Sequence, residues 1–317
     1  MKKILCICYA VLLILGSCSK SKSNREVQQS LSFGIMPSMD YIPFLVAQKE
    51  GIYDSLGLEV NFVNFNSLSE RNAAIQSGSI DGTIIDYTGV AILQSQNTPV
   101  KIIMKTDGCF SLITRKESGI KSLKQLKGHN IGVSHYSAID YATDYALNKA
   151  SILRSEVNKP EINRTSLRLK MLEYQQIDAS FFPDPFASIA MNKGYTSIIT
   201  TQDLGISLTG TAFSEKALKE KNREIKLFVQ GYNMAVDYIK NYPLKKWEQI
   251  LVENIGVSQA LASIIVLPQY RKAMLPEAKD LEGTIAWLKA KNLISPTYNI
   301  QQMTDSICLK NPETETN

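Results

Sequence analysis

The sequence predicts an α/β fold in two lobes, with mostly parallel sheets flanked by helices and a helical C-terminal region. Three observations lead to this prediction. Short apolar runs alternate with helical stretches in a βαβαβαβ order up to residue 105. A second alternating series begins near Cys109, and helical spacing dominates from Ser214 onward. Such an order is typical of parallel sheets that are covered by helices on their faces.

The first series supplies four strands and three helices. Ser67 and Glu70 have the spacing of a capping box, and Gly78 follows the end of the same helix. The hydrophobic spacing predicts strands at 31–36, 58–64, 80–85 and 100–105, and helices at 42–50, 67–76 and 88–96.

The second series follows the same logic, apart from a polar stretch at 157–166 that carries no clear pattern. It predicts strands at 110–114, 130–134, 178–182 and 196–201, and helices at 122–126, 138–151, 168–174 and 185–193. Five later helices are expected at 214–221, 223–241, 243–254, 258–267 and 278–291.

This order suggests where the chain changes lobe. We expect the crossing near 106–109 and the return near 204–212, with the late helices covering the first lobe. The expected division is therefore lobe one at 31–106, lobe two at 107–208, the helical completion of lobe one at 209–309 and a tail at 310–317.

The N-terminus has the pattern of an export signal. Lys2 and Lys3 precede an apolar run from Ile4 to Leu15, and Leu-Gly-Ser precedes Cys18. This resembles a bacterial lipobox, which implies cleavage before Cys18 and a lipid anchor on the periplasmic side of a bacterial membrane, followed by a tether at 18–30. An ordinary membrane helix and an unmodified signal are the alternatives, although the run is shorter than the roughly 20 residues that a span needs.

Composition limits the partners of the mature chain. Without residues 1–17 it carries 33 basic and 30 acidic residues, a net charge of +3, which argues against nucleic acid as a partner. No metal-ligand spacing and no CxxC occurs, so we expect neither a metal nor a cofactor. Cys109 and Cys308 either form a disulfide or remain two unpaired thiols, and we expect the second.

One ordered set of sequence segments points to a particular protein family, which the hydrophobic pattern alone does not. Residues 43–60 read PFLVAQKEGIYDSLGLEV, and AIQSGSIDG at 74–82, TPVKII at 98–103, IKSLKQLKGHNIGV at 120–133, IDA at 177–179 and DPF at 184–186 follow. Together they resemble the substrate-binding proteins of nitrate, sulfonate and thiamine-pyrimidine ABC importers, the SsuA/THI5-like (NMT1) family. The resemblance covers about residues 31–210. It implies a periplasmic-binding-protein type II fold that closes on a solute, and an ABC permease and ATPase as partners.

Ligands of open α/β sheets bind beyond the carboxyl ends of the strands, so we sought site residues in the strand-to-helix turns. Each candidate has a structural alternative, chiefly helix capping for the aspartates and a chain turn for Asp107. Phe182 would replace an aromatic residue that the family often carries where Pro183 stands here. The candidates are Asp40, Tyr41, Asp86, Tyr87, Asp107, Ser134, His135, Tyr136, Phe182 and Asp184.

Carboxylates and aromatic rings suit amines and flat heterocycles, so these candidates favour a neutral or cationic aromatic solute such as a pyrimidine vitamin precursor. A sulfonate, nitrate or taurine-type anion is the alternative. We expect a non-catalytic, monomeric solute receptor that needs no cofactor. An enzyme on the same fold and a ligand sensor without a transporter are the competing hypotheses, although the sequence contains neither GxSxG nor HExxH.

Overall fold

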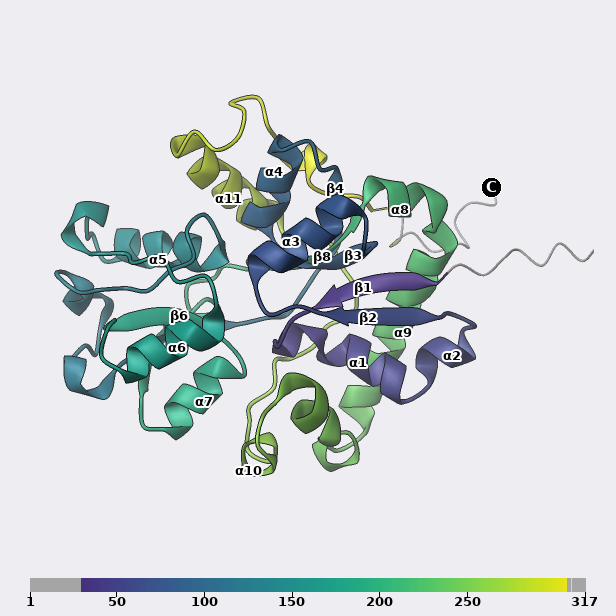
Figure 1. The fold of residues 1–317 in the computed structure, drawn as a ribbon, viewed down its shortest axis with the longest axis horizontal. Helices are drawn as coiled ribbons and strands as arrows, with labels where there is room; N and C mark the ends of the chain where they lie inside the picture. The colour runs from purple at the N-terminus through teal and green to yellow at the C-terminus, as the bar shows by residue number, and fades with distance from the viewer. Residues whose placement is uncertain (1–29, 307–308, 310–317) are drawn as a thin grey trace, which may run out of the picture.

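The structure, a computed structural model, describes residues 30–306 and 309. The predictions for the signal segment, Cys18, Cys308 and the tail therefore lie outside the described residues. Figure 1 shows two groups of elements, one around the strands β1–β4 and β8 and the other around β5–β7. We refer to these groups as the first and second lobe. None of the helices in the described range is both long and apolar enough to cross a bilayer.

The first lobe is built on a five-stranded sheet in the order β2-β1-β3-β8-β4. β1 pairs in parallel with β2 and β3, whereas β8 is antiparallel to both β3 and β4. One strand therefore runs against the other four. The strands are β1 (Leu31–Ile35), β2 (Val60–Asn64), β3 (Gly82–Asp86), β4 (Val100–Lys105) and β8 (Thr209–Ser214).

The second lobe holds a three-stranded sheet in the order β6-β5-β7. Its central strand β5 is antiparallel to both neighbours. A further segment joins the sheet through a single parallel bridge between Ile131 and Ala179. The strands are β5 (Phe110–Thr114), β6 (Ala179–Pro183) and β7 (Thr196–Thr200).

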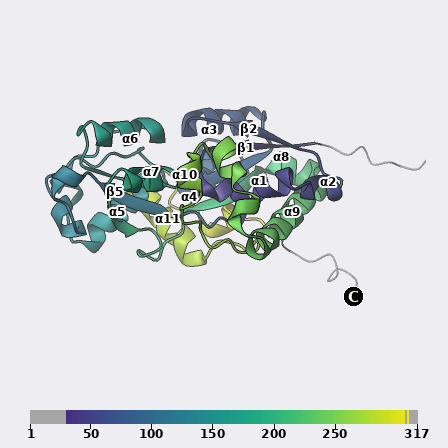
Figure 2. The ribbon, with the colours of Figure 1, turned by 90° about the horizontal axis from the view of Figure 1, so that it is seen from below.

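Helices cover both faces of each sheet, as Figures 1 and 2 show. In the first lobe α1, α2 and α9 pack on one face, and α3, α4 and α11 pack on the other. In the second lobe α5 covers one face, and α6 and α7 cover the other. The helices are α1 (Ile42–Lys49), α2 (Ile52–Ser55), α3 (Leu68–Ser77), α4 (Tyr87–Ser95), α5 (Ala138–Lys149), α6 (Thr165–Glu173), α7 (Phe186–Asn192), α8 (Glu215–Glu220), α9 (Asn222–Asn241), α10 (Gln259–Ala262) and α11 (Ala278–Ala290).

An aromatic cluster at the centre of the first lobe explains why α9 docks where it does. The buried residues of α9 recur at helical spacing and include Ile225, Phe228 and Tyr232. The ring of Phe228 stacks on Phe44 of α1 with 4.9 Å between centroids, and on Tyr53 of α2 with 5.4 Å. Burial of these rings fixes a late helix against the first helices of the chain.

Two connections join the lobes, one at residues 106–109 and the other at 201–208. Hydrogen bonds hold them beside each other at both ends. Thr106 N donates to O of Thr209, the first residue of β8, over 3.1 Å, and Thr106 Oγ1 donates to Thr209 Oγ1 over 2.8 Å. Phe110 N, at the start of β5, donates to Thr201 Oγ1 over 3.1 Å. The connections therefore lie side by side.

The α/β class, the flanking helices and most of the predicted elements are confirmed. The sheets are mixed, however, because the strand that follows each connection, β5 or β8, runs against its neighbours. The connection back to the first lobe, expected at 204–212, is shorter than predicted. Residues from Thr209 onward already pair with β3 and β4.

Three predicted elements were wrong in detail. Residues 130–134 form isolated bridges and no full strand. The helix expected at 243–254 is divided into a 3-10 turn at Leu244–Lys246 and a π turn at Leu251–Ile255, because Pro243 and Gly256 bound a short segment. The helix expected at 258–267 is limited to α10.

We predict that Phe228→Ala lowers the free energy of unfolding by about 3–5 kcal/mol, because it leaves a cavity among buried rings. Urea denaturation of both proteins measures this difference. Tyr174→Ala, at a ring that is 76% exposed, is the control and should change stability by less than about 0.5 kcal/mol. A loss below about 1 kcal/mol for Phe228→Ala would contradict the packing described here.

Candidate functional site

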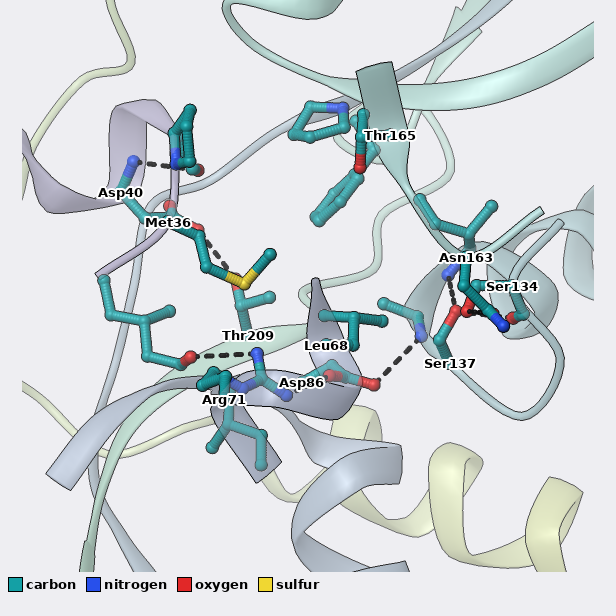
Figure 3. A pocket seen from close by; sticks show the side chains of 18 of the residues that line it. Met36, Asp40, Leu68, Arg71, Asp86, Ser134, Ser137, Asn163, Thr165 and Thr209 are labelled. Atoms are coloured by element: carbon teal, nitrogen blue, oxygen red, sulfur yellow. Dashed lines mark hydrogen bonds and ion pairs between the residues drawn. The ribbon is translucent and has the colours of Figure 1, made fainter. Parts of the chain in front are cut away.

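A cavity of about 100 Å³ lies between the two lobes. It sits at the carboxyl ends of β1, β3 and β6 and at the starts of the opposing strands β5 and β8. Figure 3 shows polar side chains from both lobes around it. Its polar lining consists of Ser38, Asp40, Arg71, Asp86 and Thr209 from the first lobe, and Ser134, Ser137, Asn163, Thr165 and Arg168 from the second.

Asp86 joins the two lobes across this cavity. Its Oδ1 lies 3.5 Å from Arg71 Nη2, and both side chains are buried. Its Oδ2 accepts hydrogen bonds from Thr88 Oγ1 and, over 3.1 Å, from the backbone N of Ala138, the first residue of α5 in the second lobe. The dashed line from Asp86 in Figure 3 marks this contact. The carboxylate is thus charge-paired on its own lobe and hydrogen-bonded to a helix N-terminus on the other.

Asp40 is the second buried carboxyl group of the cavity wall. It lies in a short 3-10 turn that leads into α1, where Ser38 accepts from Asp40 N, so Asp40 is not the cap of this turn. Its Oδ2 accepts from Thr209 Oγ1 over 3.3 Å, and its Oδ1 has no partner among the described residues. Burial, and then the charge of Asp107, raise the pKa of Asp40 to about 7.

The second lobe contributes a wall of short hydrogen-bonding side chains. Ser134 Oγ donates to Asn163 Oδ1 over 2.8 Å, and Ser137 Oγ donates to Ser134 O over 2.7 Å. Ser137 also caps α5 by accepting from Ile139 N. Asp140, in the first turn of the same helix, accepts from Tyr136 N and pairs with Lys159.

Arg71 and Arg168 were not among the candidate residues, although a sequence signal existed for both. Arg71 and Ile75 are the buried residues of α3, and Arg168 shares the buried face of α6 with Leu169 and Leu172. An arginine on the apolar face of a predicted helix is unusual, because long charged side chains are seldom fully buried without a purpose. Asn163 and Thr165 lay in the stretch that the sequence left unassigned.

Four of the ten candidate residues line the cavity, namely Asp40, Tyr41, Asp86 and Ser134. Tyr41 is buried, and its hydroxyl lies 3.4 Å from the carbonyl oxygen of Ile84. Burial raises the pKa of Tyr41 to about 12, so this hydroxyl stays protonated. These four residues come from three different turns, and the strand ends bring them together.

The other six candidates lie around the cavity without lining it. Tyr87 is buried with its hydroxyl 3.4 Å from Ser207 Oγ, and Asp107 pairs with Arg271 over 2.7 Å. Phe182 packs into the core of the second lobe. Asp184 precedes Pro185, the N-cap residue of α7, and its Oδ1 accepts from Ser188 N over 2.9 Å, while its carbonyl oxygen accepts from Met39 N of the first lobe over 3.2 Å.

His135 and Tyr136 lie at the rim of the second lobe. The Nε2 atom of His135 is 3.1 Å from Lys159 O, and Nδ1 is 3.5 Å from Glu161. The side chain of Tyr136 is 45% exposed, on a residue with a φ of 60°. Both side chains make contacts of their own outside the cavity lining.

The cavity lining combines apolar side chains with hydroxyl, amide, carboxyl and guanidinium groups. Neither histidine nor cysteine occurs among the residues that line it. Within the described ranges, no cluster of three or more His, Cys, Asp or Glu side chains is arranged to hold a metal ion. Cys109, outside the cavity, is a free thiol. Apolar side chains and a few oriented polar groups are instead typical of a binding pocket.

Comparison with protein families matches residues 38–246 to the NMT1/THI5-like family. A curated relative, the riboflavin-binding protein RibY from Chloroflexus aurantiacus, is 22% identical over 210 residues, which are 64% of this chain. The match spans about 60% of the length of that relative.

Two solved structures show how widely the fold is used. The periplasmic aliphatic sulphonate binding protein SsuA from Escherichia coli aligns with a TM-score of 0.74 at 15% identity, over 89% of this chain and 99% of that one. The desulfurization enzyme DSZB aligns with a TM-score of 0.63 at 13% identity, over 89% and 98%. At such identities the likeness shows a shared fold.

The pKa of Asp40 predicts how stability changes with pH. The folded protein keeps this proton up to about pH 7, whereas the ordinary aspartate value is 3.8. Between these values the folded state binds the extra proton, so the contribution of Asp40 to stability falls as pH rises from about 4 to about 7 and stays low above it. Asparagine resembles the protonated acid, so Asp40→Asn should gain stability over the wild type across this window, on the order of 4 kcal/mol.

Urea denaturation of both proteins at pH 4 to 8 tests this prediction. Asp54→Asn, at an exposed carboxylate, is the control and should follow the wild-type profile. A constant difference between Asp40→Asn and the wild type at all pH values would show that Asp40 does not hold its proton in the folded state.

Proposed function

Because this chain belongs to the NMT1/THI5-like family, we propose that it is a non-catalytic solute receptor that delivers a small molecule to an ABC importer. The observation that carries the proposal is the cavity lined by both lobes. The bonds from Ala138 N to Asp86 and from Met39 N to Asp184 O connect the same two lobes beside it. A solute bound there would contact both lobes at once, and would therefore favour the closed arrangement.

The size of the cavity argues for a hinge motion. An apolar cavity of roughly 150 Å³ is enough for benzene, and drug-sized ligands occupy about 300–1,000 Å³. A cavity of about 100 Å³ is smaller than either. A larger solute would therefore enter by separation of the lobes about the paired connections at 106–109 and 201–208.

For the solute we propose a neutral flat heterocycle, such as a pyrimidine vitamin precursor. The apolar lining includes Ile84, Ile139 and Phe110, which suit a ring. A cationic solute is disfavoured because Asp86 already pairs with Arg71 and because the pKa of Asp40 is near 7. A small anion of the sulfonate or nitrate type is the second candidate, and the presence of Arg168 in the cavity wall favours it.

We further propose that the chain acts outside the cytoplasm, as a monomer held to a membrane by lipid on Cys18. The lipobox-like sequence before Cys18 supports this location. Two lipid chains would be enough for a stable anchor. A transporter-independent sensor would use the same cavity, and neighbouring permease and ATPase genes would argue for import.

An enzyme on this fold remains the competing class. The lining of the cavity offers hydroxyls, carboxyls and guanidinium groups but no imidazole or thiol among the described residues. Incubation of the protein with a solute that it binds, followed by mass spectrometry, separates the two classes. A receptor returns the solute unchanged, and a new product would identify an enzyme.

Binding should stabilise the protein by an amount that grows with ligand concentration over Kd, about 2.7 kcal/mol at 100 times Kd. We predict that Ala138→Leu fills the cavity and weakens binding of the solute at least about tenfold, because Ala138 is buried in its wall. Thermal shift and calorimetry with riboflavin, 4-aminopyrimidine, ethanesulfonate and nitrate measure the effect.

Ala278→Leu is the matched control, because Ala278 is likewise the first residue of a helix but is exposed. It should bind as the wild type does. Equal affinities of Ala138→Leu and the wild type would place the binding site elsewhere.

A further inference from the structure

Arg168 is the most completely buried cation of the cavity wall. Its residue is 1% exposed, and it lies in the first turns of α6, whose start follows Asn163. Asn163, Thr165 and Arg168 all line the cavity from the second lobe. Arg168 is therefore withdrawn from bulk water, although it is one of the residues that line the cavity.

The contacts of Arg168 hold the group in place without neutralising it. Its Nη1 donates to Ile162 O over 2.8 Å, and Nη2 lies 3.4 Å from Thr165 Oγ1. The guanidinium carbon lies 5.5 Å from the ring centroid of Phe182. Its Nε has no hydrogen-bond partner among the described residues. Both acceptors are neutral, so the Nε donor and the full positive charge remain unmatched among the described residues.

Two other arginines of this chain have their charge balanced by a carboxylate. Arg71, in the opposite wall, pairs with Asp86 at 3.5 Å, and Arg115 pairs with Asp178 at 2.7 Å. Within the described part of the chain, no carboxylate forms an ion pair with Arg168. Burial lowers the pKa of Arg168 to about 10, so the group stays charged at neutral pH. Burial of a cation without a counter-charge is unfavourable unless a binding partner supplies an acceptor or a negative charge.

The remaining acids of the cavity do not balance this charge. Both oxygens of Asp86 are engaged by Arg71, Thr88 and Ala138. Asp40 lies in the first lobe and is bonded to Thr209. The wall formed by the second lobe thus contains one fixed, charged arginine among neutral hydrogen-bonding residues. Such a group recognises an oxygen acceptor and repels a cation.

We infer that Arg168 is a specificity-determining residue, whose guanidinium donates to an oxygen acceptor of the solute and excludes cationic solutes. This inference rests on the proposed function of the cavity. The acceptor is either a carbonyl oxygen of a heterocycle or an acidic oxygen, and the two share the same hydrogen-bond geometry. If Arg168 had only a structural role, it would consist of the hydrogen bond to Ile162 O and the packing of the guanidinium on Phe182.

The test compares Arg168→Met, which keeps length and removes the charge, with Arg168→Lys, which keeps the charge and loses the planar group. Calorimetry uses riboflavin for ring carbonyls, ethanesulfonate for an acidic oxygen and thiamine for a cation. Arg154→Met is the matched control, since Arg154 lies in the same lobe, is exposed and does not line the cavity.

We expect Arg168→Met to lose about tenfold or more in affinity for the oxygen-bearing probe that the wild type binds, and Arg168→Lys to lose less. Affinity for thiamine should rise in Arg168→Met. Arg154→Met should stay within about twofold of the wild type, as expected for an exposed charge. An unchanged affinity of Arg168→Met, or tighter wild-type binding of thiamine than of the other probes, would overturn the inference.

The thermal midpoints of the ligand-free variants provide a readout that needs no solute. If Arg168 is kept for binding, Arg168→Met unfolds within a few degrees of Arg168→Lys. A much lower midpoint for Arg168→Met alone would assign the charge a structural role and overturn the inference. Failure of the wild type to bind any probe, with the midpoints of the two variants close together, would count against the proposed solute class and leave the assignment of Arg168 supported.

Discussion

The carboxylate of Asp86 is the interaction on which the rest of the site depends. Asp86 ends a fully buried strand, and its two oxygens are shared between Arg71, Thr88 and the N-terminus of α5. Removal of one partner would leave a buried charge unmatched, which is costly in a protein interior. The same carboxylate accepts one of the hydrogen bonds that join the two lobes beside the cavity.

The chain topology explains why the polar groups meet at that place. The strands β1, β3 and β6 end at the cavity, whereas β5 and β8 begin there because each runs against its neighbours. Thr106, in the connection before β5, is hydrogen-bonded to Thr209, the first residue of β8. The two connections between the lobes thus lie beside the cavity wall, at the same edge of both sheets.

The sequence predicted the α/β class, most of the elements, and the turns that hold Asp40, Tyr41, Asp86 and Ser134, because hydrophobic period and strand order are local signals. It did not predict the direction of β5 and β8, since strand direction depends on distant pairing. It also missed Arg71, Asn163 and Arg168, which reach the cavity from helices and from an unpatterned loop. Helix spacing shows that a residue faces inward, but not which cavity it meets.

Hydrogen exchange tests the central claim most directly, because the amides of Ala138 and Met39 donate across the two lobes to Asp86 and Asp184. The measurement compares exchange with and without a solute that the protein binds. The account predicts slower exchange in peptides that cover residues 36–41 and 134–140, with both segments protected together. Protection confined to one lobe, or to a surface away from these segments, would contradict it.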